Sequence, residues 1–479
     1  MSKQDKKELR QQIACEWLEE NYLQFGSLRH DVVTDRLQVR CAHSLGDEAI
    51  GRLGERQETW RNLTDKDINT MVCQCVAEKG VNISTNEMWT ALKSDMVPAV
   101  HPLRAWLDEL RPYTADQPDW IDFVAQQVHV KNNNAECGIN KDNLNNLCAR
   151  PTLALAKEDI SPLSQQQSVS SPLSNVLISL RSNDRVAYGE AEELSMLSSE
   201  QTTPLSLQDS LADRLWRACF KKWFVAMVAS WMKDEVVNHT VLVLVGRQGI
   251  FKTTWLDNLI PPELRAYSSK LPLSGQISKD DRLRLCENGL LNIDELDAMC
   301  GREMNIVKSL LTSTDVNERA AYGRLKERRV RLASFCASTN KREFLTDITG
   351  NRRWLPFEVE SIQNPFHTII PYERLYAQAK ALVEEGIFSY WFDMEEMEVM
   401  EAHNEEFRAQ ENEEQLLPIL FDVPAEGKGE FMTTAEISDR LVSHGGIKKP
   451  MSTRQLGVIM GKMGFQKAQV RISGTCVRG

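Results

Sequence analysis

A short apolar run that leads directly into a glycine-containing loop is the first place in this 479-residue sequence where chemistry can be expected. Residues 241–245 (VLVLV) are followed by GRQGIFKTT, which has the spacing of a phosphate-binding loop that opens a helix. The residues that carry this pattern are Gly246, Gly249, Lys252, Thr253 and Thr254. Glycines let successive N–H groups turn toward phosphate oxygens, and the helix N-terminus adds its positive dipole end. The pattern predicts ATP and Mg²⁺ as cofactors, with the lysine on the β- and γ-phosphates and Thr253 on the metal.

The loop departs from the usual pattern at one position. Phe251 precedes the lysine where a glycine is usual, and a bulky side chain there predicts a reshaped loop or a lower nucleotide affinity. Taken alone, the motif is also compatible with an ordinary strand-to-helix turn that contains glycines. The residues farther along the chain decide between the two interpretations.

Two adjacent carboxylates end a second apolar run. Residues 289–293 (GLLNI) lead into Asp294 and Glu295. The aspartate suits the hydration shell of Mg²⁺, and the glutamate suits the general base that aligns an attacking water. A strand that ends in Asp-Glu is commonplace by itself, but in tandem with the loop it favours ATP hydrolysis.

Two further polar features follow. Asn340 ends the apolar run 331–339, where its amide can contact the γ-phosphate or position the water, although asparagine ends many strands without such a role. Arg352 and Arg353 lie in a Gly-Asn turn before the next hydrophobic strand. They can pair with surface acids, but after a sensor strand one of them is better interpreted as an arginine finger on the transferring phosphoryl group. Because such fingers usually enter a neighbouring subunit's site, we expect a homo-oligomer.

An α/β domain must position these residues. Strands and helices alternate over residues 207–360, which predicts a parallel sheet, and a long amphipathic helix, or two, precedes it from residue 206. Residues 1–130 predict a mostly helical module with a short strand at 37–42. Residues 131–206 are rich in Ser, Asn, Gln and Pro, which is typical of a flexible insert.

The C-terminal part predicts two further units. Residues 361–418 form an acidic, helical segment, and residues 419–479 have the order helix, helix, hairpin, which fits a winged-helix domain. Residues 451–465 then suit a recognition helix, with basic side chains that face phosphate: Lys448, Lys449, Arg454 and Lys462. Duplex DNA is one expected partner of this domain, and protein docking is the alternative.

The order of motifs resembles the virulence-associated protein E family of phages and mobile elements, and more distantly the superfamily 3 AAA+ helicases, including poxvirus-type primase-helicases. The resemblance is carried by residues 246–254 (GRQGIFKTT), 290–297 (LLNIDELD), 316–340 and 349–359 (TGNRRWLPFEV), and it extends to residues 28–40 and 96–110. It implies an AAA+ P-loop core that forms a ring, a hexamer by analogy, and a nucleotide-driven role in the replication of a mobile element.

The resemblance also implies a hairpin that grips single-stranded DNA in the ring channel, in the interval before Asn340. Tyr322 could stack on a base, and the basic residues of this interval could neutralise phosphates. These are Arg324, Lys326, Arg328 and Arg329. A solvated basic face, or pairing with acids of an adjacent subunit, is the alternative.

Composition sets outer bounds on these expectations. The net charge is −11, but residues 391–415 hold ten acidic residues and one basic residue, so the total does not exclude nucleic acid. The most apolar run is far shorter than a membrane span, so we expect a cytoplasmic protein with no membrane contact. The 11 cysteines predict reduced, structural thiols and no zinc site. Residues 1–200 lack the carboxylate pattern of a primase, so a separate protein would make any primers.

Two hypotheses about function follow. The first is a DNA-stimulated ATPase that translocates on DNA as a ring-forming replicative helicase of a phage or mobile element. The second is an ATP-gated DNA-binding switch or initiator that loads other proteins and does not unwind DNA.

Overall fold

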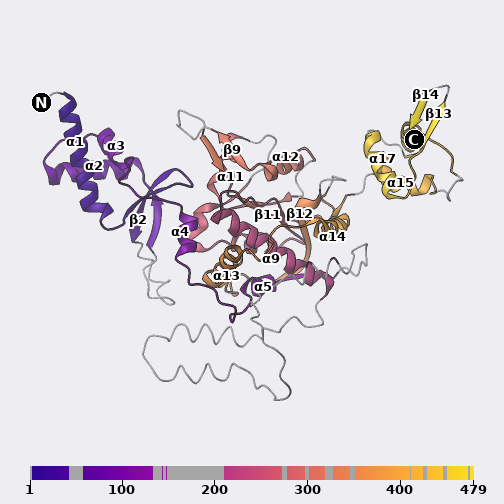
Figure 1. Ribbon diagram of the computed structural model, residues 1–479, viewed down its shortest axis with the longest axis horizontal. Helices are drawn as coiled ribbons and strands as arrows, with labels where there is room; N and C mark the ends of the chain where they lie inside the picture. The colour runs from indigo at the N-terminus through magenta and orange to yellow at the C-terminus, as the bar shows by residue number, and fades with distance from the viewer. Residues whose placement is uncertain are drawn as a thin grey trace, which may run out of the picture.

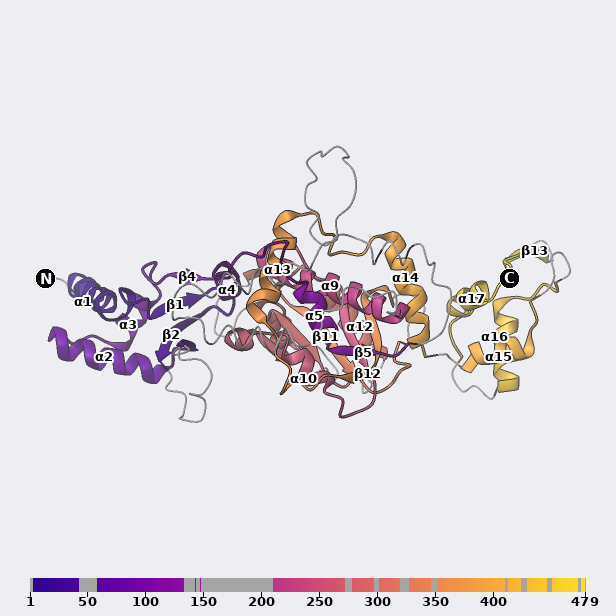
Figure 2. The ribbon, with the colours of Figure 1, turned by 90° about the horizontal axis from the view of Figure 1, so that it is seen from below.

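The computed structural model describes residues 3–42, 58–132, 143, 147, 210–271, 278–296, 301–318, 327–345, 351–409, 412–423, 429–445, 450–472 and 475–478. They form a mixed α/β protein with several sheets. Figures 1 and 2 show an N-terminal module, a central sheet with its helices, and a C-terminal group of helices arranged along one line. The expected insert at 131–206 lies almost entirely outside the described residues.

The central sheet has six strands in the order β5-β12-β6-β11-β8-β7. The strands are β5 (Val128–Val130), β12 (Trp354–Ile362), β6 (Val241–Val245), β11 (Ser334–Thr339), β8 (Leu290–Ile293) and β7 (Ser268–Lys270). The five strands from β12 to β7 are parallel, as the alternating pattern predicted, and β5 is antiparallel at the edge.

Helices cover both faces of this sheet. Val241, Val243 and Val245 of β6 pack on one face with α11 (Lys279–Glu287) and α12 (Gly301–Thr312). Leu242 and Leu244 pack on the other face with α9 (Leu211–Met232), α10 (Lys252–Asp257) and α13 (Tyr372–Glu385). A strand covered on both faces is apolar throughout, which is the physical reason for the run VLVLV.

Helix α9 is less amphipathic than its sequence pattern suggested. None of its residues is exposed, because the sheet covers one side of the helix while α13 and α5 (Trp120–Ala125) pack against it as well. Even Lys222 is only 2% exposed, and its Nζ donates to Glu396 Oε2 at 3.0 Å in α14 (Met394–Asn404). A helix with no exposed residue is a core helix, and α9 is one although it carries several charged side chains.

A buried arginine connects three parts of this core. Arg331, just before β11, is fully buried and donates to the backbone carbonyls of Asn238, Leu310, Leu311, Ser313 and Ala333. Burial lowers the pKa of its guanidinium to about 9. The carbonyl dipoles of the C-terminal end of α12 take the place of the water that this cation loses.

The N-terminal module combines helices with a sheet of its own. Its first three α-helices are α1 (Lys3–Leu18), α2 (Asp65–Lys79) and α3 (Thr85–Leu92), with a π-helical turn at Glu19–Leu23; α4 (Pro102–Asp108) follows. The strand expected at 37–42 falls within β2 (Arg36–Ala42), but β2 belongs to a sheet of order β3-β2-β1-β4, with β3 (Glu58–Asn62), β1 (Leu28–Asp31) and β4 (Ala99–Val100). The Tyr267 hydroxyl, just before β7, donates to Asp31 Oδ2 at 2.9 Å and ties this module to the central sheet.

The C-terminal residues contain helices followed by a hairpin. They are α15 (Asn412–Leu420), α16 (Thr434–Gly445), α17 (Thr453–Lys462) and the antiparallel strands β13 (Gln469–Ile472) and β14 (Thr475–Arg478). Leu417, Leu441 and Leu456 form their common core. The acidic run 391–415 is divided between α14, a short 3₁₀ turn at Glu405–Phe407, and α15. Across the described residues, no helix is both long and apolar enough to cross a membrane.

Candidate functional site

The strand register brings three polar strand ends to one edge of the central sheet. Thr339 of β11 is level with Val245 of β6, and Ala337 of β11 is level with Ile293 of β8. Residues that follow these strands therefore meet at the carboxyl edge, where open α/β sheets bind their ligands. The loop 246–254, Asp294 and Asn340 all lie there, as the sequence predicted.

Side-chain oxygens converge around the Asp294 carboxylate. Its Oδ1 accepts from Thr253 Oγ1 at 3.0 Å and from Ser338 Oγ at 2.8 Å, and the two hydroxyl oxygens lie 3.1 Å apart. An all-oxygen donor set suits a hard cation such as Mg²⁺. The sequence interpretation missed Ser338, although its position two residues before Asn340 on a strand places both side chains on one face.

Lys252 and Asn340 are in direct contact. The lysine is 6% exposed, and its Nζ donates to Asn340 Oδ1 at 3.1 Å and to the backbone oxygens of Gly246 and Arg247 at 2.7 and 2.8 Å. An ammonium group has three donors, and here each meets an uncharged oxygen. Phosphate oxygens, which carry charge, would bind the same donors more strongly.

A second lysine reaches the carboxylate from the edge strand β7. Lys270 Nζ lies 2.9 Å from Asp294 Oδ2, because Lys270 is level with Asn292 in the sheet. Burial raises the pKa of the Asp294 carboxyl, but hydrogen bonds from Lys270, Ser338 and Thr253 outweigh it and hold that pKa below its usual range. The carboxylate therefore stays ionised. Nothing in the spacing of the sequence indicated Lys270.

Two glycines of the loop are required by its geometry. A Cβ at Gly246 would lie 2.8 Å from the backbone oxygen of Val359. Gly249 has φ = 85°, in the left-handed region that side chains disfavour. Together these constraints account for the glycine spacing from which the loop was predicted.

Phe251 adopts the backbone conformation that a glycine would adopt easily. Its φ is 65° and its ψ is 17°, so the loop keeps a left-handed turn at this position despite the side chain. A left-handed residue other than glycine costs roughly 1–2 kcal/mol. The phenyl ring makes an edge-on contact with Phe366, with ring centroids 6.1 Å apart. The unusual residue therefore strains the backbone, and the glycine-like turn remains.

We expect Phe251→Gly to bind ATP at least as tightly as the wild-type protein, and Phe251→Ile to bind it about fivefold more weakly. Glycine adopts positive φ freely, whereas a β-branched residue would pull the loop out of this turn at a cost of about 1 kcal/mol. Calorimetric titration with ATP and Mg²⁺ measures both affinities. A large loss of affinity in Phe251→Gly would show instead that the phenyl ring itself supports nucleotide binding.

Glu295 also has a left-handed backbone, with φ = 56°, and an exposed side chain directly after Asp294. Sparsely populated backbone conformations cluster at functional sites.

Arg352 and Arg353 lie at the opposite edge of the sheet. They occupy a 3₁₀ turn, Asn351–Arg353, directly before β12, whose first residue Trp354 is level with Val241 at the start of β6. The phosphate loop begins five strand residues farther along, roughly 17 Å away at about 3.3 Å per residue. Within the described part of the chain, neither guanidinium has an ionic or hydrogen-bonding partner. Neither arginine is therefore placed to serve the loop of its own chain.

The interval predicted to hold a DNA hairpin does contain two paired strands. Strands β9 (Asp315–Glu318) and β10 (Glu327–Val330) are antiparallel, with Glu318 level with Glu327. Tyr322, Arg324 and Lys326 lie outside the described residues.

The two arginines on β10 have acidic partners in the same chain. Arg328 pairs with Asp315, and Arg329 lies 3.4 Å from Asp35 and 3.7 Å from Glu287. Both arginines therefore pair with acids of their own chain, whereas the alternative given by the sequence was pairing with acids of an adjacent subunit. Arg329, whose side chain is 15% exposed, is a poor candidate for a phosphate contact.

The basic residues of the C-terminal segment are placed only in part. Arg454 is exposed in the first turn of α17, as a phosphate contact requires. Lys462 pairs with Glu405 at 2.6 Å. Lys448 and Lys449 lie outside the described residues.

The fold is that of a mixed α/β protein with polar residues at one edge of its central sheet, and comparison of the sequence shows which family this part of the chain resembles. Residues 202–409 match the virulence-associated protein E-like domain. The resemblance inferred from the motifs is confirmed. Comparison with curated proteins gives no match.

Among solved structures, the NrS-1 C-terminal region aligns with most of the chain. The apo structure of the NrS-1 C-terminal region (305–718) shares 10% identity at a TM-score of 0.38, covering 95% of this chain and 96% of that one. Two A-form apo structures of the same region, also 10% identical, have TM-scores of 0.36 and 0.33 and cover 96% and 95% of this chain, and 98% and 97% of theirs. The family resemblance rests on residues 202–409 alone.

Proposed function

We propose that this chain hydrolyses ATP with Mg²⁺ at the carboxyl edge of its central sheet. The observation that carries the proposal is the convergence of the phosphate loop, Asp294 and Asn340 at that edge. Lys252 contacts Asn340, and Thr253 contacts Asp294, across three neighbouring strands. The sequence predicted these four residues for one reaction although they come from distant parts of the chain. In the structure they form two hydrogen-bonded pairs.

Each residue has a role in the proposed reaction. Lys252 would bind the β- and γ-phosphates, and Asn340 would fix the lysine and the γ-phosphate relative to each other. Thr253 and Asp294 would hold Mg²⁺, which supplies neutralisation of phosphate charge when bound. Glu295 would orient the attacking water and accept its proton. Lys270 would have to leave Asp294 Oδ2 if that oxygen faces the metal.

The proposed assembly is a ring, a hexamer by analogy with the superfamily 3 AAA+ helicases. Arg352 and Arg353 support the ring, because they lie far from the phosphate loop of their own chain. Both belong to the 3₁₀ turn Asn351–Arg353, in which Arg352 is exposed and Arg353 is partly exposed. In a ring they would complete the site of the adjacent copy. We further propose that residues 419–479 are a winged helix that contacts duplex DNA through α17.

In the same proposal the chain is a replicative helicase of a phage or mobile element. The match of residues 202–409 to the virulence-associated protein E-like domain and the paired strands β9 and β10 support DNA in the channel. A switch or initiator that binds DNA without unwinding it is the second candidate, favoured by the Lys270–Asp294 ion pair, which must rearrange before a metal can use both carboxylate oxygens.

ATP hydrolysis with and without single-stranded DNA tests the proposal. We expect turnover that depends on Mg²⁺ and rises when DNA is added. Tyr322→Ala and Arg324→Ala should weaken DNA binding and reduce stimulation, with stacking worth ~1–3 kcal/mol per base and the salt slope shallower by about 0.7 per lost phosphate contact. Lys93→Ala, which removes a lysine of the N-terminal module distant in sequence from the hairpin, is the matched control.

A C-terminal deletion, assayed for ATPase stimulation and for DNA binding, distinguishes the helicase hypothesis from the switch hypothesis. Deleting residues 420–479 should spare single-strand stimulation and weaken duplex binding. If the hairpin variants behave as the wild-type protein while this deletion removes all DNA binding, the helicase proposal fails and the switch replaces it.

A further inference from the structure

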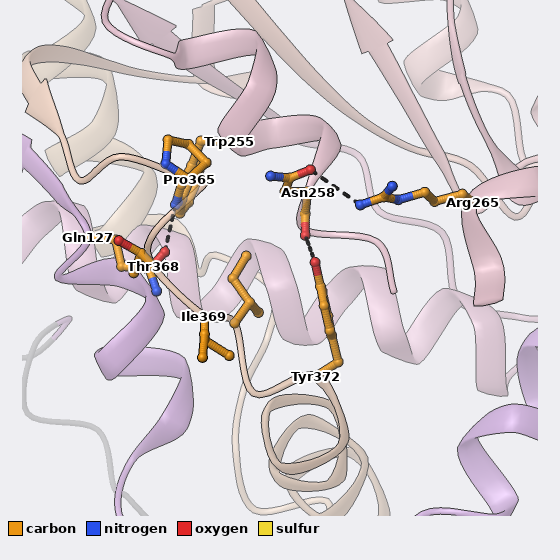
Figure 3. Close-up of a pocket in the computed structure, with 9 residues that line it drawn as sticks. Gln127, Trp255, Asn258, Arg265, Pro365, Thr368, Ile369 and Tyr372 are labelled. Carbon is orange, nitrogen blue, oxygen red and sulfur yellow. Dashed lines mark hydrogen bonds between the residues drawn. The ribbon is translucent and has the colours of Figure 1, made fainter. Parts of the chain in front are cut away.

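A pocket of about 220 Å³ lies at the C-terminal end of α10, the helix that the loop 246–254 opens (Figure 3). Its walls come from α10 and the residue after it, from the 3₁₀ helix Pro262–Tyr267, from Gln127 just before β5, and from the segment between β12 and α13 together with the first residue of α13. The residues that line it are Gln127, Trp255, Asn258, Arg265, Pro365, Thr368, Ile369, Ile370 and Tyr372. None of them is used by the reaction proposed above.

The pocket and the phosphate loop are joined by two elements. Trp255 lies three residues after Lys252 on α10, an axial step of about 4.5 Å. On the other wall, Phe366 follows the pocket residue Pro365 and contacts Phe251 of the loop. The pocket and the loop thus share the helix α10 and are linked by one aromatic contact.

Gln127 presents a buried donor to this pocket. The residue is 3% exposed, and its Oε1 accepts from Trp255 Nε1 at 3.1 Å. An indole N–H can only donate, so the amide orientation is fixed and Nε2 faces away from Trp255, as Figure 3 shows. Among the described residues Nε2 has no hydrogen-bond partner. A buried donor without a partner is unfavourable, and a ligand acceptor would remove that cost.

The other walls suit a flat, uncharged group. Trp255, Pro365 and Ile369 supply apolar surface, and the Thr368 hydroxyl can donate or accept at the rim. The far end is held by hydrogen bonds from the Tyr372 hydroxyl to Asn258 O at 2.6 Å and from Arg265 to Asn258 Oδ1 at 3.5 Å. Such a lining, mostly apolar with a few fixed polar groups, is typical of small-molecule sites.

We propose that this pocket holds the nucleobase of the bound nucleotide and that Gln127 Nε2 donates to a ring nitrogen of the base. The inference rests on the proposed function, because the phosphates must occupy the loop 246–254. Gln127, Trp255 and Thr368 are then determinants of nucleotide specificity.

Two variants and two ligands test the proposal by calorimetry in the presence of Mg²⁺. Gln127→Glu keeps the acceptor for Trp255 and replaces the free donor with an acceptor. Ile369→Trp fills the pocket from a position that is 51% exposed, and Ile387→Trp, at a position 61% exposed outside the pocket, is its matched control. The ligands are ATP and inorganic tripolyphosphate, which has the phosphates without the base.

We expect both pocket variants to bind ATP at least tenfold more weakly than the wild-type protein and to bind tripolyphosphate within twofold of it. The control should bind both ligands normally, and Lys252→Ala should lose both. Normal ATP affinity in either pocket variant, or a parallel loss of tripolyphosphate, overturns the nucleobase pocket while the ATPase proposal stands. A wild-type protein that binds neither ligand overturns both.

Discussion

Glu295→Gln is expected to bind ATP with wild-type affinity and to hydrolyse it at least ~10²-fold more slowly, which is the scale of general-base catalysis. Glutamine has the same size and keeps one oxygen, but it cannot accept the proton of the attacking water. The exposed side chain of Glu295 makes a folding defect improbable as the cause. Phosphate release under saturating ATP and Mg²⁺, together with ATP titration, measures the two quantities separately.

Lys252→Ala provides the contrasting control, since it should abolish ATP binding by removing the charge that contacts the phosphates. Glu263→Gln, an acidic residue in the 3₁₀ helix Pro262–Tyr267, should leave both binding and turnover unchanged. Normal turnover in Glu295→Gln would refute the assignment of the base and leave Asp294 as the carboxylate to test next.

Substitution of the finger arginine should be nearly as damaging, with a loss of ~10³–10⁵-fold in turnover. The sheet register predicts that the loss arises in trans, because Arg352 and Arg353 lie at the far edge from their own loop. The turnover of Arg352→Ala and of Arg353→Ala, each measured alone, shows which guanidinium is needed. Mixing the inactive arginine variant with Lys252→Ala protein should restore part of the activity, since one copy supplies the loop and the other the arginine.

Two observations would contradict action in trans. One is a mixture that stays inactive although light scattering shows that the two variants assemble together. The other is wild-type turnover per chain that stays constant on dilution to a concentration at which only monomers are present. Either result would place the arginines in a structural role at the start of β12.

The core of the site could be predicted because its residues end strands. Asp294 and Asn340 follow apolar runs, and parallel strands bring their carboxyl ends to one edge whatever their order. Lys270 could not be predicted in the same way, because its contact with Asp294 depends on β7 lying beside β8, and a strand of three residues leaves no periodic pattern.

The other differences between the sequence predictions and the structure arise from contacts with residues that are distant in the chain. Arg329 was predicted to neutralise phosphate, yet one of its carboxylate neighbours is Asp35 of the N-terminal module. The burial of α9 likewise depends on helices from both sides of it in the chain. The tip of the hairpin, residues 319–326, and Lys448 and Lys449 remain predictions from the sequence.

The backbone carbonyls that accept hydrogen bonds from Arg331 also affect how this domain unfolds. Their oxygens belong to the turn before β6, to the end of α12 and to the start of β11, which are far apart in the chain. A cation stripped of water is tolerable only when all of them are in place, since an unpaired buried charge costs several kcal/mol. Intermediates that keep some of these elements and lose the others are therefore penalised, and the sheet, α12 and the strand that carries Asn340 should melt as one cooperative unit.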